Sequence, residues 1–164
     1  MIKKTLFKLL FVLFIVLPVF AMAAGQTAKT LLPKASAEAK NWQPDAALVN
    51  LYTSSAELDG TGVWAFTFLS PKTKQKIVVM VDGNGEVSRY DSSYYKNDVV
   101  GGFTVDSDKA MADAIKNGLK TNKFGMKMSL EKHEGRAEWR MQDDKNFYYI
   151  DANSGKFLRK EKTD

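Results

Sequence analysis

Two stretches of this chain share one pattern, and their repetition restricts the fold more than any other feature. VMVDGNGEVSRY ends at Tyr90, and YYIDANSGKFL spans residues 148–158. Each runs apolar residues into an Asp, then into a polar turn with Gly, then into a second apolar or aromatic run. Turns this short join antiparallel strands. The repetition therefore predicts two copies of one fold unit, in which the Asp shapes a turn.

The residues around these stretches repeat the same order of elements. Apolar residues three and four apart predict a helix over 32–42, with Pro33 in its first turn, and a second helix that begins at Asp106 or Ser107. Each helix precedes several short alternating runs, one of which carries a Trp. We predict an α+β fold of two similar units, each a short helix packed on a three- to four-stranded antiparallel sheet.

The same patterns predict the division of the chain. Its parts are a signal peptide (1–23), a flexible lead-in (24–30), a first repeat (31–90), a connector (91–105), a second repeat (106–159) and a charged tail (160–164).

The N-terminus has the composition of a secretory signal. Lys3, Lys4 and Lys8 precede an apolar run over 9–20, and Ala21-Met22-Ala23 follows. The alternative is an uncleaved anchor, but a membrane span needs roughly 20 apolar residues. We therefore expect cleavage near Ala23, a periplasmic or secreted protein, and no stable membrane span after removal of the signal.

Charge and cysteine content exclude several function classes. The chain carries 24 basic and 19 acidic residues, and three of the lysines lie in the predicted signal, which leaves a net charge of +2. Scattered charges with so small an excess argue against nucleic-acid binding. The absence of cysteine excludes disulfides, thiolate metal sites, cysteine nucleophiles and a lipid-modified cysteine.

The last hairpin resembles a known family. The run Ile150-Asp151-Ala152-Asn153-Ser154-Gly155-Lys156-Phe157-Leu158, behind an Ala-bearing helix and a Trp-bearing strand, is similar to the PepSY domain. The first half has the same layout but carries Gly83 where the family has Ala. The resemblance implies a tandem pair of small exported or membrane-linked modules. The family has been linked to the regulation of peptidases and to envelope roles, and it has no family-wide catalytic residues.

The candidates for chemistry all have a simpler explanation. Asp82 to Glu86 alternates oxygen ligands like a calcium loop, but the twelfth position, which needs a Glu, is Ser93. His133, the one histidine, lies in a charged predicted turn, and Asp143-Asp144 sits in another. We therefore expect no enzyme activity, no metal site and no cofactor.

Tyrosines supply the candidate contact residues. Tyr90, Tyr94 and Tyr95 lie in or beside the connector, and Tyr is common at protein contact surfaces. The alternative is that the connector is a strap that packs one unit against the other. We predict an exported, non-enzymatic binding module of the cell envelope, which modulates a peptidase or another envelope or secreted protein. The alternative function is a small-ligand carrier with its site between the two repeats.

Overall fold

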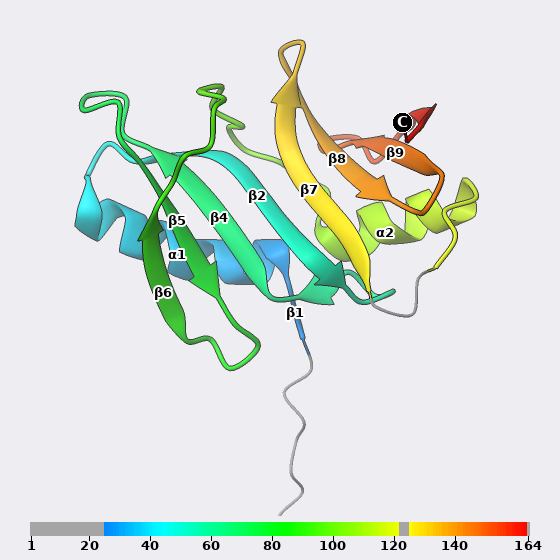
Figure 1. The fold of residues 1–164 in the computed structure, drawn as a ribbon, viewed down its shortest axis with the longest axis horizontal. Coiled ribbons are helices and arrows are strands. Elements are labelled where there is room, and N and C mark those ends of the chain that lie inside the picture. The colour runs from blue at the N-terminus through cyan, green and yellow to red at the C-terminus, as the bar shows by residue number, and fades with distance from the viewer. Residues whose placement is uncertain (1–24, 122–124, 164) are drawn as a thin grey trace, which may run out of the picture.

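The chain folds into one large antiparallel sheet with two helices on the same face (Figure 1). The computed structural model describes residues 25–121 and 125–163, so the predicted signal peptide lies outside the described residues. Within those two ranges, neither helix has the length and apolar character of a membrane span.

The sheet has eight strands in the order β10-β9-β8-β7-β2-β4-β5-β6, and every neighbouring pair is antiparallel. Its strands are β2 (Ala47–Ala56), β4 (Trp64–Leu69), β5 (Lys76–Val81), β6 (Val87–Asp91), β7 (Met126–His133), β8 (Arg136–Gln142), β9 (Asn146–Asp151) and β10 (Phe157–Lys162). The chain therefore folds in the α+β class, as the alternating runs predict.

The two halves of the chain meet at the centre of this sheet. Strand β2 pairs with β7, and Leu51 lies opposite Leu130, both with fully buried side chains. The two predicted sheets thus form one sheet, and buried residues from both halves form a single core cluster. Trp64 and Trp139 touch edge to face inside it, with ring centroids 5.9 Å apart.

Helix α1 (Ala28–Trp42) begins earlier than predicted. Its start is held by the other half of the chain: the backbone N–H of Ala28 donates to Ser107 Oγ, and that of Lys29 donates to Asp106 Oδ1. Pro33 consequently lies inside the helix and not in its first turn. Helix α2 (Ser107–Lys116) begins where predicted, with Asp106 as its N-cap.

The lead-in and the tail are more ordered than the sequence suggested. Strand β1 (Gln26–Thr27) pairs with β3 (Thr61–Gly62), and the remainder of the predicted lead-in up to Thr30 is helical. Strand β10 continues through Lys162, so most of the predicted charged tail is sheet. Strands outside each segment supply the hydrogen bonds: β3 for the lead-in, and the preceding strand β9 for the tail.

The repeated aspartates shape their turns. Asp82 Oδ1 accepts the backbone N–H groups of Asn84 and Glu86 at 2.9 and 2.7 Å. Asp151 Oδ1 accepts those of Asn153 and Ser154 at 3.0 and 2.7 Å. Hydrogen bonding of this kind is how Asp stabilises a turn.

Candidate functional site

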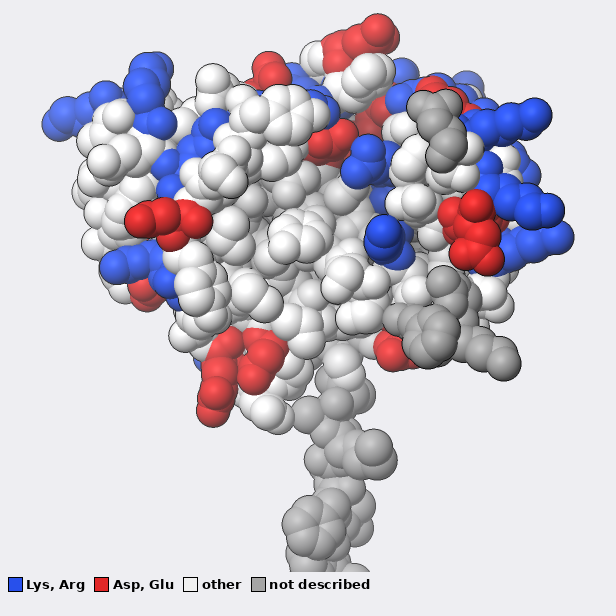
Figure 2. All heavy atoms as spheres, viewed as in Figure 1, with Lys and Arg blue, Asp and Glu red and all other residues white. Residues whose placement is uncertain are grey.

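The face of the sheet that the helices leave uncovered carries the candidate site. Both helices lie behind the sheet in Figure 1, and Figure 2 looks onto the open face. Charged side chains gather towards the edges of this face, and mostly uncharged atoms fill its middle. A face that water reaches, framed by charge, is where an antiparallel sheet can receive a ligand.

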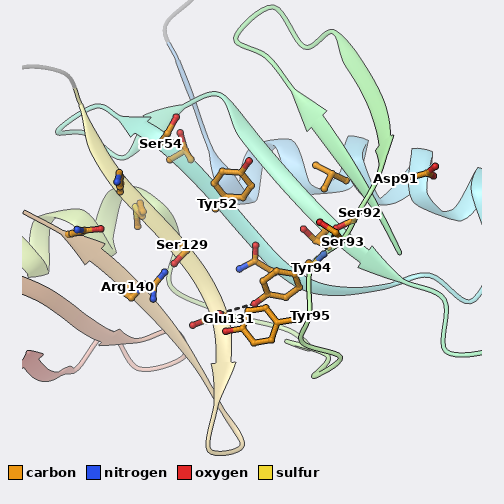
Figure 3. A pocket seen from close by; sticks show the side chains of 17 residues that line it. Tyr52, Ser54, Asp91, Ser92, Ser93, Tyr94, Tyr95, Ser129, Glu131 and Arg140 are labelled. Atoms are coloured by element: carbon orange, nitrogen blue, oxygen red, sulfur yellow. Dashed lines mark hydrogen bonds between the residues drawn. The ribbon is translucent and has the colours of Figure 1, made fainter. Parts of the chain in front are cut away.

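A groove with a volume of about 610 Å³ lies in the middle of this face (Figure 3). Strands β2, β4 and β5 of the first half line it together with β7 and β8 of the second half. Residues 91–95, from the end of β6 into the connector, form a further wall. Small-ligand sites in proteins commonly occupy roughly 300–1,000 Å³, so the groove has the size of a ligand site.

Strand alternation explains which side chains reach the groove. Successive residues of a strand point to opposite faces. Tyr52 therefore faces the groove while Leu51 enters the core, and Ser129 faces it while Leu130 is buried. At these positions the polar side chains lie on the groove face, and the apolar side chains pack into the core on the helix face.

The connector is tied to this face by Glu131. Tyr94 Oη donates to Glu131 Oε2 at 2.8 Å, and Lys96 Nζ lies 2.9 Å from the same oxygen. Lys76 Nζ donates to the Tyr94 carbonyl at 2.5 Å. The connector thus crosses from the first half to a strand of the second half, as the strap alternative expected.

These contacts determine the charge states around Glu131. Burial raises the pKa of Tyr94, and its hydrogen bond to Glu131 raises it further, so the phenol stays protonated at neutral pH. Burial by itself raises the pKa of Glu131, but the hydrogen bonds from Lys96 and Tyr94 outweigh it and leave that pKa below its usual value. Glu131 is therefore an ionised carboxylate with its charge already compensated.

Two other polar groups of the groove, Ser129 and Arg140, form no hydrogen bond or ion pair within the described residues, although the charge of Arg140 helps to lower the pKa of Glu131. Ser129 is only 8% exposed, and its hydroxyl has no hydrogen-bond partner among residues 25–121 and 125–163. Arg140 lies directly opposite Ser129 on β8. The Arg140 guanidinium packs over the Phe147 ring, 5.2 Å from its centroid, and no carboxylate of the described chain lies within 4 Å of it.

The predicted contact residues separate in the structure. Tyr94 and Tyr95 line the groove, and their rings are 5.5 Å apart. Tyr95 is 78% exposed. Tyr90 pairs with Val78 and so shares the open face, but it lies on edge strand β6 and does not line the groove.

Sequence reasoning missed Tyr52, Ser129 and Arg140. The sequence pattern could have placed each of them on the open face, since each alternates with buried residues along its strand. What the alternation could not show is that β2 and β7 are neighbours. Only that pairing brings Tyr52 beside Ser129 and Arg140.

The residues considered for catalysis and metal binding lie elsewhere. His133 is exposed at the end of β7. Asp143 is buried and accepts backbone N–H groups, whereas Asp144 faces water. In the described ranges, no three His, Asp or Glu side chains are grouped to hold a metal ion.

Comparison with known proteins identifies a shared fold. No family model and no curated protein matches the chain. Its structure is similar to the crystal structure of a "putative lipoprotein" from Clostridium difficile 630, with a TM-score of 0.56 and 18% sequence identity. The match covers 80% of this chain and 92% of the other. The PepSY resemblance stays a prediction.

Proposed function

We propose that this chain is an exported, non-enzymatic binding protein of the cell envelope whose ligand occupies the groove on the open sheet face. The observation that carries the proposal is the groove itself, about 610 Å³ in volume and walled by both halves of the chain. Tyr52, which is 47% exposed, and Tyr95, which is 78% exposed, offer aromatic surface there.

The chemistry of the groove supports binding over catalysis. A serine nucleophile needs an adjacent base that takes its proton. The Ser129 hydroxyl has no hydrogen-bond partner in the described part of the chain, and Glu131 is engaged by Lys96 and Tyr94. The groove therefore has hydrogen-bonding groups suited to holding a ligand.

Two observations support the envelope location. The N-terminus has the composition of a secretory signal. The crystal structure of similar fold is that of a "putative lipoprotein". We accordingly place this chain in the periplasm or outside the cell.

The internal layout supports a tandem pair of PepSY-like units. Each half contributes one helix and four strands that are neighbours in the large sheet. The Trp64 indole N–H donates to the carbonyl of Gln26, and that of Trp139 donates to the carbonyl of Val105, each two residues before a helix begins. Equivalent bonds at equivalent places are expected if one unit was duplicated.

A protein partner is the second candidate occupant, as expected for a modulator of a peptidase or another envelope protein. Strand β6 is an edge of the sheet, and an edge strand can accept an added strand from a partner. Tyr90 on this edge is 55% exposed and could contact such a partner.

Tyr52→Ala and Tyr90→Ala form a matched pair that tests the proposal. Both remove an exposed tyrosine from the same face, but only Tyr52 lines the groove. The exported chain and each variant are incubated with envelope extract, and retained small molecules and proteins are identified by mass spectrometry. We expect Tyr52→Ala to weaken capture about tenfold and Tyr90→Ala to leave it unchanged, since a buried aromatic contact contributes about 1–2 kcal/mol.

The reverse result would move the site to the β6 edge and favour a protein partner. Equal capture by all three proteins, or capture by none, would contradict binding in the groove.

A further inference from the structure

We propose that the groove binds a small aromatic carboxylate, with Arg140 and Ser129 donating hydrogen bonds to the carboxylate and Tyr52 packing against the ring. This inference rests on the proposed function and names the ligand class of the same groove. Three observations support it: an arginine with no carboxylate within 4 Å in the described chain, a buried hydroxyl without a hydrogen-bond partner there, and an aromatic wall beside both.

Arg140 differs from the other arginines of the chain. Arg89 pairs with Glu38, Arg136 with Glu138, and Arg159 with Glu138 and Glu161, each at 3.0 Å or less. Arg140 has no carboxylate within 4 Å in the described chain, although it is half-buried in the groove wall. A half-buried guanidinium is stabilised by an anion that accepts its planar set of N–H donors.

Ser129 adds a second donor at the same place. Burying a hydroxyl without a hydrogen-bond partner costs about 1–3 kcal/mol. Among the described residues, the Ser129 hydroxyl is the buried side-chain group that lacks such a partner. Because Ser129 and Arg140 lie directly opposite each other on β7 and β8, their polar groups can reach one bound anion. A carboxylate has two oxygens, and these can accept bonds from the guanidinium and the hydroxyl together.

The nearby acid does not take this role. Glu131 is two residues from Ser129 on the same face, and the charge of Arg140 helps to lower its pKa, but its Oε2 is held by Lys96 and Tyr94 and it lies more than 4 Å from the guanidinium. Exposed Lys127 also lines the groove and adds positive charge on the same strand. The donors of Arg140 and Ser129 are therefore left for a ligand.

Tyr52 defines the apolar part of the ligand. It lies opposite Ser129 on the other side from Arg140, so the three residues form a row across β2, β7 and β8 (Figure 3). A flat ring attached to the carboxylate would stack or pack edge to face on the Tyr52 ring. The volume of about 610 Å³ suits a small molecule of this kind.

N-acetyltryptophan and its amide are the matched probes, because they differ only at the carboxyl group, which is a charged carboxylate in the acid and a neutral carboxamide in the amide. Binding is measured by calorimetry and by the shifts of backbone amide resonances in an NMR titration. We expect the acid to bind with shifts centred on Tyr52, Ser129 and Arg140, and the amide to bind about tenfold more weakly or not at all, since a charge-assisted bond to arginine is lost.

Three variants locate the carboxylate. Arg140→Gln should weaken binding of the acid about tenfold, and Arg140→Lys should restore part of it because the charge remains but the planar fork is lost. Ser129→Ala should weaken binding roughly threefold to tenfold without lowering the melting temperature of the free protein, since it removes an unpaired group. Arg89→Gln, which removes an arginine paired outside the groove, should have no effect on binding.

Several results would overturn the inference. Equal affinity for the acid and the amide would exclude recognition of the carboxylate, as would full binding by Arg140→Gln. Binding of a tripeptide that ends in Trp, without binding of the free acid, would assign the groove to a protein C-terminus instead. If Tyr52→Ala abolishes capture from envelope extract while Arg140→Gln and Ser129→Ala retain it, the proposed function stands and this ligand class is wrong.

Discussion

Asp143 illustrates how a single carboxylate acts structurally in this protein. Its oxygens accept backbone N–H groups from Lys120, Lys145 and Asn146 and the hydroxyl of Tyr148. Burial raises the pKa of Asp143, but these four donors outweigh burial and lower it to about 2. The ionised side chain joins the segment after α2 to the turn between β8 and β9.

Asp143→Asn should reduce the stability of the protein at neutral pH. Because the pKa is lower in the folded chain than in the unfolded chain, the ionised form contributes stability above pH 5, and this contribution disappears as the pH falls from about 4 towards 2. We expect a loss of about 1–2 kcal/mol at pH 7 that shrinks over this acid range. Urea denaturation at several pH values measures it.

Asp144→Asn is the matched control, since Asp144 is the adjacent and exposed acid. A loss of stability in Asp143→Asn that stays the same from pH 7 to pH 2 would contradict the pKa argument.

The two helices depend on each other at their N-termini. Asp106 Oδ1 accepts the N–H of Ser107 in α2 at 2.6 Å and that of Lys29 in α1 at 2.9 Å. Ser107 Oγ accepts from Ala28 and donates to the Gly60 carbonyl at 2.7 Å. This close approach of Gly60 to the start of α2 requires a glycine, because its φ is +75° and a Cβ there would lie 2.3 Å from the backbone N of Asp108. One acid thus compensates the positive ends of two helix dipoles.

Asp106→Ala should destabilise the protein by about 1–2 kcal/mol, because one change removes the N-cap of α2 and a cap of α1. Thermal unfolding followed by far-ultraviolet circular dichroism measures the effect. Asp98→Ala, which removes an exposed acid in the connector, is the control and should change stability by less than about 0.5 kcal/mol. Equal melting temperatures for the two variants would show that the shared cap contributes nothing.

At the scale of the whole molecule, the two halves behave as one body because they share a sheet and a core. Strands β2 and β7 pair at the centre, and Trp64 from one half contacts Trp139 from the other. Phe103 of the connector also packs edge to face on Trp139, at 5.7 Å between ring centroids. Neither half could bury its central residues without the other.

Leu130→Ala should therefore destabilise both halves together. Leu130 is fully buried opposite Leu51 at the junction, and such a truncation costs about 2–5 kcal/mol. Urea unfolding followed by tryptophan fluorescence and by circular dichroism should give a single, coincident transition, shifted to lower urea. Leu58→Ala, at an exposed leucine, should unfold like the unchanged protein. Separate midpoints for the two signals would mean two independently folding units.

The sequence by itself determined the local structure of this protein. Alternation with period two placed Trp64, Phe66 and Phe68 on a buried face, and Asp with Gly marked the hairpin turns. It also predicted Tyr94 and Tyr95, which line the groove, as contact residues. Strand alternation and hairpin turns depend on residues a few positions apart, so they can be predicted from a single sequence.

Tertiary structure alone decided how distant segments combine. The early start of α1 depends on hydrogen bonds from Asp106 and Ser107, which lie far along the chain. The row of Tyr52, Ser129 and Arg140 exists because β2 pairs with β7 in one continuous sheet, although 69 residues separate Ala56, the last residue of β2, from Met126, the first of β7. The alternation of residues within a strand indicates which of its faces is buried, but it does not identify the strand that pairs with it. Many strands with one apolar face could pair with β2, so its pairing with β7 is decided only in the folded structure.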